Sequence, residues 1–452
     1  MAPRSTVCAL LVALAVPASA LGQAPDEQRQ DEQWAVRAGA VLRLPGAWEL
    51  SQGAGVVVAV IDSGTRLDHS DLAPNAWVNF GELSGNGADD DGNGYVDDVH
   101  GVDLTTKSAS QDLSDGNGHG THVAGIIAGA ANRRGIVGVA FRARIMTVKV
   151  LSASGAGTTA ALAEGIRYAA ANGARIINMS LGGDQPDERV REAIAVAAGA
   201  NVLVVCSAGN DARDIDVQPS YPVSFAAPNL IGVAATSPVE GRRLGGFSNF
   251  GRTTVALAAP GEDVLSSTSD GGHGFLSGTS MAAPHVSGVA ALMAAVAPRL
   301  SAPELRAQLL QNAVPASIPV GSGFLDALGS VRAAAGASGI SLGQPPRLRI
   351  LQARFAGRGR GAQTLVRFAV TGATDQVRRY RVMLGGRRAA ELAPGPKVLT
   401  MRKRGRPART ARVLALDAAG QSLARASARV RAVRKGKRNV DRGSRVGVES
   451  EP

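Results

Sequence analysis

Residues 276–293 read LSGTSMAAPHVSGVAALM, and we expect the rest of the fold to be organised around this stretch. Pro284 lacks an N–H and so fits the first turn of a helix. The apolar side chains beyond it recur at helical spacing and predict a buried helix: Val286, Val289, Ala290 and Met293. Ser280 is then expected where a loop enters this helix, beside free backbone N–H groups and the positive end of the helix dipole. It is either a capping serine or a nucleophile with an oxyanion site beside it.

Length and composition predict a globular α/β protein of two or three domains, with 452 residues, 45% of them hydrophobic, and 56 glycines. The N-terminus has Arg4, an apolar run and the small residues Ala18-Ser19-Ala20, so we interpret residues 1–20 as a signal peptide of a secreted protein. No later stretch is expected to span a membrane. Cleavage would leave Cys206 as the lone cysteine, and its apolar surroundings predict a buried structural thiol rather than a nucleophile.

Charge divides the chain into two parts. From Pro345 to the end there are 27 Lys and Arg against 6 Asp and Glu, a net charge of +21, while the rest carries 22 basic and 31 acidic residues, a net charge of −9. This asymmetry marks a domain boundary. We expect an arm at 21–31, a larger α/β domain at 32–337 and a linker at 338–346. Short alternating runs predict a basic antiparallel β-sandwich at 347–433, and a disordered basic tail follows at 434–452.

The acidic part alternates strand and helix patterns, which predicts a mostly parallel central sheet with helices on both faces. Expected strands lie at 55–61, 143–151, 174–181, 201–206, 231–235 and 255–259, and expected helices at 160–172, 188–198 and 301–311. Asp62 then stands at the carboxyl end of a strand, where open α/β sheets place their sites.

The segment ADDDGNGYVDDVH, residues 88–100, places oxygen ligands at alternate positions around glycines. Such a loop can converge several oxygens on one hard cation, so we expect a structural Ca²⁺ site rather than a plain acidic turn. The expected ligands are Asp89, Asp91, Asn93, Tyr95 through its carbonyl, and Asp97.

Two histidines stand three apart in GNGHGTHVAG, at His119 and His122. Histidines at this spacing on a helix can bind zinc, but no glutamate base accompanies them, so a packed core histidine is the favoured interpretation of His122. Nucleophilic catalysis needs a hydroxyl, an imidazole and a carboxylate, together with a donor to the oxyanion. Ser280, His119, Asp62 and Asn210 supply all four, each at a strand end or a helix start.

These motifs together resemble the subtilisin-like serine proteases, the subtilases, over residues 32–335. VAVIDSG is similar to the family's aspartate motif, GHGTHVAG to its histidine motif, GTSMAAPHVSG to its serine motif and SAGN to its oxyanion segment. The resemblance implies that Asp62 orients the base His119, that Ser280 is the nucleophile, and that the Asn210 amide and the Ser280 N–H stabilise the oxyanion.

The resemblance also implies how a substrate binds. The peptide would lie as an extra strand between two edges and be recognised mainly through its backbone, which implies broad specificity. The implied edge residues are Ser180, Leu181, Gly182, Gly183, Ser154, Gly155, Ala156 and Gly157. Tyr221-Pro222 matches a family site for a cis peptide bond near the specificity pocket. A second calcium loop would fall at residues 131–137, where Asn132 fits but Arg133 and Arg134 place cations.

The function that we expect is a secreted serine endopeptidase that acts on proteins or peptides. A binding protein on the same scaffold and a metal-dependent hydrolase are the alternatives. The basic C-terminal part suggests an anchor to an anionic cell-envelope polymer or a solvated spacer. Nucleic acid is a weaker candidate, because no stacking aromatic residues interleave with the charge.

Overall fold

The computed structural model describes residues 27–37, 41–106, 111–238 and 243–338, and the strands between 347 and 432. The chain divides into two compact units, one of residues 22–341 and one that contains residues 342–452. The predicted signal peptide, residues 339–346 of the predicted linker and the predicted tail lie outside the described residues.

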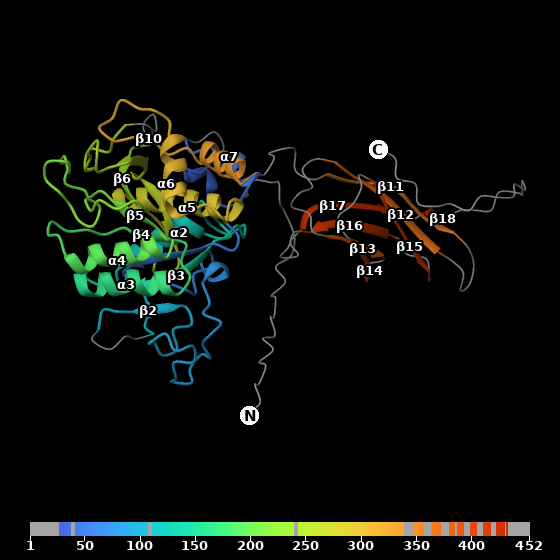
Figure 1. The fold of residues 1–452 in the computed structure, drawn as a ribbon, viewed down its shortest axis with the longest axis horizontal. Coiled ribbons are helices and arrows are strands. Elements are labelled where there is room, and N and C mark those ends of the chain that lie inside the picture. The colour runs from blue at the N-terminus through green and yellow to red at the C-terminus, as the bar shows by residue number, and fades with distance from the viewer. Residues whose placement is uncertain are drawn as a thin grey trace, which may run out of the picture. The chain divides into compact units, whose positions relative to one another are not determined.

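A parallel eight-stranded sheet forms the centre of the first unit, in the order β10-β7-β6-β5-β4-β1-β3-β2 (Figure 1). Its strands are β1 Val57–Asp62, β2 Gly101–Asp103, β3 Arg144–Lys149, β4 Ile176–Met179, β5 Leu203–Ser207, β6 Leu230–Thr236, β7 Leu257–Pro260 and β10 Gly323–Phe324. Six of the eight coincide with strands expected from the sequence. The short strands β2 and β10 were not predicted, since two or three residues carry no periodic pattern.

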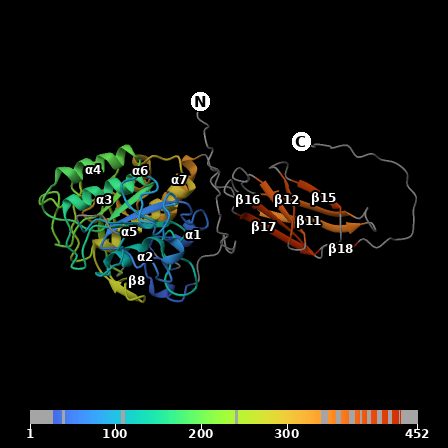
Figure 2. The same ribbon diagram turned by 90° about the horizontal axis from the view of Figure 1, so that it is seen from below.

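Helices cover both faces of this sheet, which confirms the predicted α/β class (Figure 2). On one face lie α1 Leu44–Trp48, α2 His119–Ala128, α5 Thr279–Val296, α6 Ala302–Gln311 and α7 Ala327–Ala337. The other face carries α3 Thr159–Ala171 and α4 Glu188–Gly199. Alternate residues of β1 pack on opposite sides: Val58 and Val60 face the α5 core, and Ala59 and Ile61 face the α3 core.

Helix α5 is the buried helix expected around Pro284, but it begins earlier than the sequence suggests. It starts at Thr279, so Ser280 is its second residue and Pro284 lies inside the helix rather than in its first turn. Pro284 cannot donate to the carbonyl of Ser280 four residues before it. That carbonyl instead accepts from Ser180 Oγ at 2.8 Å, which satisfies the acceptor and explains why the helix tolerates the proline.

The same helix meets the length and composition of a membrane span, which the sequence did not lead us to expect of any segment. Its 18 residues have a mean hydropathy of 1.3, long and apolar enough to cross a membrane. However, 83% of the helix is buried inside the protein, where it packs against strands of the central sheet.

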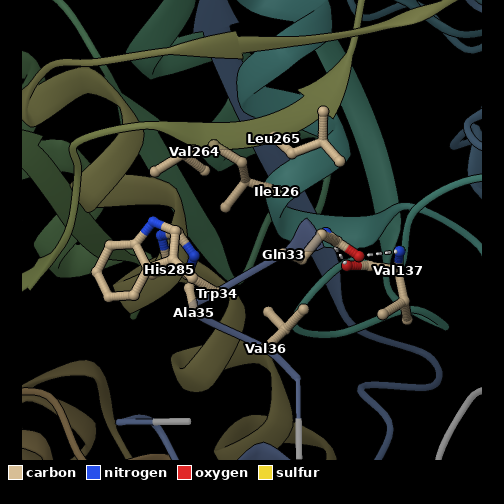
Figure 3. Close-up of a pocket in the computed structure, with 9 residues that line it drawn as sticks. All are labelled: Gln33, Trp34, Ala35, Val36, Ile126, Val137, Val264, Leu265 and His285. Carbon is tan, nitrogen blue, oxygen red and sulfur yellow. Dashed lines mark hydrogen bonds between the residues drawn. The ribbon is translucent and has the colours of Figure 1, made fainter. Parts of the chain in front are cut away.

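The segment that precedes α1 is partly buried. Of the described residues in the predicted arm, Glu27 is buried and residues 28–31 are exposed or half-exposed, whereas residues 33, 35 and 36 pack near α2, α5 and β8. The segment contains a short 3₁₀ helix, Gln30–Glu32, and a second 3₁₀ helix follows β1 at Ala73–Asn75. Glu27 is buried, and its carboxylate accepts from the N–H of Arg134. The N–H of Arg29 donates to the carbonyl of Gly135. Gln33 makes two hydrogen bonds with the main chain of Val137 (Figure 3).

A small pocket lies beneath this segment, and Figure 3 shows its lining: Gln33, Trp34, Ala35, Val36, Ile126, Val137, Val264, Leu265 and His285. Its titratable group, His285, donates from Nδ1 to the carbonyl of Met281, and burial lowers the pKa of this imidazole to about 4. The pocket therefore presents a neutral, internally bonded side chain and no obvious reactive group.

A two-stranded antiparallel hairpin, β8 Val264–Ser267 and β9 His273–Leu276, leads into α5. The second unit consists of two four-stranded sheets, β15-β12-β11-β18 and β14-β13-β16-β17, with β11 against β16 and β17. All strand pairs are antiparallel except β11 with β18. The strands are β11 Arg347–Ala356, β12 Gln363–Thr371, β13 Arg379–Leu384, β14 Arg387–Leu392, β15 Val398–Arg404, β16 Thr410–Leu416, β17 Ser422–Arg429 and β18 Arg431–Ala432. This arrangement is the small β-sandwich expected from the alternating runs.

Candidate active site

Asp62 and His119 meet at the carboxyl edge of the sheet. Asp62 is the last residue of β1 and is almost fully buried, and His119 is the first residue of α2. Asp62 Oδ1 accepts from His119 Nδ1 at 2.8 Å. Burial alone would lower the pKa of His119, but the Asp62 carboxylate outweighs it and raises that pKa above its ordinary value.

Ser280 lies at the same edge, next to the strand that neighbours β1. Ile61 of β1 pairs in register with Met179 of β4, so Asp62 and Ser180 follow on adjacent strand ends. Ser180 holds Ser280 by two hydrogen bonds: Ser180 Oγ donates to the Ser280 carbonyl, and Ser280 Oγ donates to the Ser180 carbonyl at 3.2 Å. The hydroxyl therefore points to Ser180 here rather than to His119. His119 Nε2 makes no hydrogen bond to any residue that the structure describes.

Asn210 is placed beside Ser280 by Thr279. Its Oδ1 accepts from Thr279 N at 2.9 Å and from Thr279 Oγ1 at 3.0 Å, and Gly209 N–H donates to the same hydroxyl. Because Oδ1 is bound on this side, the amide nitrogen of Asn210 is the group left to face outward. The Ser280 N–H, at the second position of α5, has no intrahelical carbonyl to bind. Two donors thus lie beside the Ser280 side chain.

Both expected substrate edges already use some of their backbone groups. In the edge at residues 154–157, Gly155 N–H donates to the Ser152 carbonyl at 2.9 Å and the Ala156 carbonyl accepts from Ser152 N–H at 2.8 Å. Residues 154–157 are all exposed. On the other edge, Gly183 already exchanges two hydrogen bonds with Tyr221, at 2.9 and 2.7 Å, and the carbonyl of Ser180 binds Ser280 Oγ. Leu181 and Gly182 form no backbone hydrogen bond with the described part of the chain. The Tyr221-Pro222 peptide bond is cis, as the resemblance implied.

His122 lies inside the core instead of facing the acidic loop. It is completely buried, its Nε2 contacts the carbonyl of Gly274 at 3.1 Å, and burial lowers the pKa of its imidazole to about 4. A neutral imidazole bonded to the main chain is consistent with a core histidine and gives no support to a zinc pair with His119.

The acidic loop gathers a different set of carboxylates from the expected one. Glu82, Asp91 and Asp98 offer oxygens within 4.8 Å of one another, and Asn79 donates to both Asp91 and Asp98. None of the three forms an ion pair with a described Lys, Arg or His. Hard oxygen donors without a neutralising side chain fit Ca²⁺.

The other expected ligands serve the loop itself. Asp97 accepts from the N–H groups of residues 85–87, and Asp89 accepts from those of residues 92–94. Asn93 donates to Asp91 and Asp98, and the Tyr95 N–H donates to Asn93 Oδ1. Of the five expected ligands, Asp91 alone belongs to the three-carboxylate cluster.

Sequence reasoning missed three carboxylates. Glu82 and Asp98 belong to the cluster in the acidic loop, and Asp115 lies beside the start of α2. Glu82 precedes the glycine-rich motif, and Asp98 looks like a duplicate of Asp97. Asp115 precedes the Gly-Asn-Gly turn before His119, and an aspartate three or four residues ahead of a helix start is the signal that could have revealed it.

Comparison with known proteins agrees with this geometry. The family model "Subtilase family" matches residues 53–363, more than half of the chain. The chain belongs to the subtilase family. This subtilase is 38% identical to thermitase of Thermoactinomyces vulgaris, over 56% of this chain and 80% of thermitase. It is also 36% identical to an extracellular protease of Xanthomonas campestris, over 69% of this chain and 57% of that protein.

The relatives of this subtilase come from different compartments, since an intracellular serine protease of Paenibacillus polymyxa is 38% identical over 61% of this chain and 79% of that protein. Among solved structures, proteases from Pseudoalteromonas arctica align with a TM-score of 0.57 at 31% identity, covering 69% of this chain and 99% of that one. A cold-adapted subtilisin-like serine proteinase aligns with a TM-score of 0.51 at 33% identity, covering 62% and 90%. This chain is therefore a subtilisin-like serine protease.

Proposed function

We propose that this subtilase is a secreted endopeptidase of broad specificity that cleaves peptide bonds through Ser280, His119 and Asp62. The observation that carries the proposal is the 2.8 Å bond from His119 Nδ1 to the buried Asp62, formed one strand away from the end of β4 that holds Ser280. With Nδ1 protonated and bound, Nε2 is the basic nitrogen and is left to accept a proton.

Each group has one task in the reaction. Ser280 Oγ turns from the Ser180 carbonyl, gives its proton to His119 Nε2 and attacks the peptide carbonyl carbon. The Asn210 amide and the Ser280 N–H stabilise the negative charge on the carbonyl oxygen, while Asp62 stabilises the imidazolium. His119 then protonates the leaving amine, and a water molecule activated by His119 hydrolyses the acyl-enzyme.

Fluorophosphonate labelling with peptide mapping tests this assignment. We expect stoichiometric label on Ser280, and we expect Ser280→Ala to abolish both labelling and peptide hydrolysis. Ser277→Ala is the matched control, because Ser277 lies three residues away and bonds the N–H of Asp263 through its hydroxyl. Folded protein without label or peptidase activity would favour the alternative of a binding protein on a protease scaffold.

We also infer that the acidic loop binds one structural Ca²⁺, with Glu82, Asp91 and Asp98 as its carboxylate ligands. The inference rests on three mutually close carboxylates, two of them buried, that no described basic side chain neutralises. Calorimetric titration of chelator-treated protein with CaCl₂ is expected to show one site per chain. An absence of heat and of any change in melting temperature would rule the site out.

Secretion and attachment to an anionic cell-envelope polymer complete the proposal. Residues 1–20 have the pattern of a signal peptide, and residues 345–452 carry a net charge of +21. Binding of the full chain to an immobilised anionic polysaccharide should weaken steeply with added NaCl, because opposite charges attract through a screened field. Binding that resists salt would contradict an electrostatic anchor, and an N-terminus of the exported protein at Met1 would contradict the signal peptide.

A further inference from the structure

A second buried carboxylate stands four residues before His119. Asp115 is only 6% exposed and accepts four hydrogen bonds. Its Oδ1 accepts from Ser63 Oγ and from Gly118 N–H, both at 2.8 Å. Its Oδ2 accepts from Thr121 N–H at 2.8 Å and from Thr121 Oγ1 at 2.6 Å. Each donor is close in sequence to Asp62 or to His119.

Two of these bonds cap the helix that carries His119. The residue at the N-cap position of α2 is Gly118, with φ of 91° in the left-handed region, and it has no side chain with which to cap. Asp115 supplies the missing acceptor for the N–H groups of Gly118 and Thr121, on either side of the histidine. The first turn of α2, and with it the position of the imidazole, is therefore fixed from outside the helix.

The third bond reaches the other half of the pair. Asp62 Oδ1 accepts from His119 and from the Ser63 N–H at 2.8 Å, while Asp62 Oδ2 is buried with no hydrogen-bond partner among the described residues. The orientation of the Asp62 carboxylate thus depends on Ser63. Ser63 is held in turn by its hydroxyl, which donates to Asp115 and accepts from Gly120 N–H at 3.0 Å.

We propose that Asp115 is a positioning residue that fixes Asp62 and His119 relative to each other, acting through Ser63 on one side and through the first turn of α2 on the other. This inference rests on the proposed function of Asp62 and His119. Asp115 touches neither substrate nor the reacting atoms, so it acts on the rate through geometry and charge.

The charge of Asp115 adds to that of Asp62. Burial lowers the pKa of His119, and the carboxylates of Asp62 and Asp115 raise it. The remaining charged and titratable groups nearby are His122, which is neutral near pH 7, and Lys149 of β3. Lys149 donates to the carbonyls of Asp112 and Ser114 in the loop that carries Asp115. Removing the negative charge of Asp115 should therefore lower the pKa of His119.

Asparagine cannot replace this carboxylate. The two backbone N–H groups bind different oxygens, Gly118 to Oδ1 and Thr121 to Oδ2. Whichever way an amide is turned, its NH₂ group faces one of these N–H donors, so one backbone donor loses its acceptor. Asp115→Asn should therefore disturb both the position of α2 and the charge beside His119.

The test is a pH profile of kcat/KM for a peptide amide substrate. For Asp115→Asn we expect a loss on the order of 10–100-fold, carried by kcat rather than KM. Because the base must be neutral, we also expect the acid limb of the profile to move to lower pH. Ser63→Ala cuts the link to Asp62 and removes the acceptor of Gly120 N–H, but it keeps the charge of Asp115 and its bonds to Gly118 and Thr121. We therefore expect kcat to fall without a shift of the acid limb.

Asp326→Asn is the matched control. Asp326 is also a buried capping aspartate, at the start of α7, where it bonds Gly329 N–H and pairs with Arg43. This variant should lose stability but keep the wild-type pH profile. A folded Asp115→Asn enzyme with an unchanged profile and kcat/KM would overturn the inference. If Asp115→Asn does not fold, an unchanged kcat in Ser63→Ala overturns it. Failure of wild-type protein to label at Ser280 would instead refute the proposed function.

Discussion

Two carboxylate sites in the first unit differ in the partners that the chain supplies to them. Asp71, completely buried, accepts from His273 Nε2 at 2.7 Å, from Asn132 Nδ2 at 3.0 Å and from Ile136 N–H at 3.2 Å. Glu82, Asp91 and Asp98 form no ion pair with a Lys, Arg or His among the described residues. Asp71 finds its partners within the chain, whereas no described basic side chain pairs with the second cluster, and this is why we propose an ion there.

This difference is the basis for proposing metal-dependent stability at the acidic loop and not at Asp71. The resemblance to subtilases placed a second calcium loop at residues 131–137, where Arg133 and Arg134 seemed to supply the cation. In the structure the side chain that donates to Asp71 is instead His273, a residue of β9 more than a hundred positions away. Burial alone would raise the pKa of Asp71, but the bonds from His273, Asn132 and Ile136 hold it below its ordinary range.

Breaking the Asp71–His273 pair should have the largest effect on stability. Asp71→Ala removes the acceptor of His273 Nε2, Asn132 Nδ2 and Ile136 N–H. Each buried donor that is left unsatisfied costs about 1–3 kcal/mol. The free energy of unfolding should be measured by urea titration in the Ser280→Ala background, which prevents self-digestion. His273→Ala and the double variant complete a cycle, and a coupling energy near zero would show that the two groups do not act as a pair.

Removal of Ca²⁺ should have the next largest effect. A ligand present at a hundred times its Kd stabilises the folded state by about 2.7 kcal/mol, so chelation should lower the melting temperature by several degrees. Asp91→Asn should make the protein insensitive to chelator and to added CaCl₂. A melting temperature that is the same in chelator and in CaCl₂ would mean that this loop holds no stabilising ion.

Asp97→Asn sharpens this test, because it separates the two ligand sets. The sequence pattern makes Asp97 a ligand, whereas in the structure its carboxylate caps the N–H groups of residues 85–87. We therefore expect Asp97→Asn to lower stability while leaving the Ca²⁺ affinity unchanged. A loss of affinity equal to that of Asp91→Asn would favour the ligand set expected from the sequence.

The sequence predicted what depends on local pattern and missed what depends on distant contacts. Asp62, His119, Asn210 and Ser280 were predicted because each follows a strand run or starts a helix, and the carboxyl ends of parallel strands share one edge. The position of Pro284 within the helix was misjudged because Ser180, a hundred residues away from Ser280, binds the Ser280 carbonyl that the proline cannot bind. The pairing of Asp71 with His273 leaves no local signal at either residue.

Burial explains the remaining differences. The arm around Glu27 has the composition of a solvated segment, yet folding brings the Arg134 N–H to the Glu27 carboxylate. Burial raises the pKa of Glu27 above its ordinary range, because desolvation outweighs the hydrogen bonds that stabilise the charge. The local sequence around a charged residue does not predict a hydrogen-bond partner that lies far away in the chain.

The buried imidazoles His122 and His285 belong to a third class, groups that stay neutral instead of being paired. Their pKa values are about 4 in the folded protein against about 6.5 in an unfolded chain, so the unfolded state binds more protons between these values. Stability should therefore fall as pH falls from 6.5 toward 4, by about 2 kcal/mol per imidazole between pH 7 and 5. His285→Gln should reduce this pH dependence by about half, and an unchanged slope would contradict the neutral assignment.

Cys206 should show the smallest effect, which is none in the native state. It lies fully buried in β5, and burial raises the pKa of its thiol because no partner offsets the cost of a buried thiolate. Iodoacetamide at pH 8 should therefore leave native activity intact and label Cys206 only in urea. Asp71 and Cys206 are equally buried, so the comparison shows the effect of hydrogen-bond partners on ionisation. The Asp71 carboxylate beside His273 stays charged, and the Cys206 thiol among apolar side chains stays neutral. Rapid labelling of native protein would show that the β5 core opens to solvent.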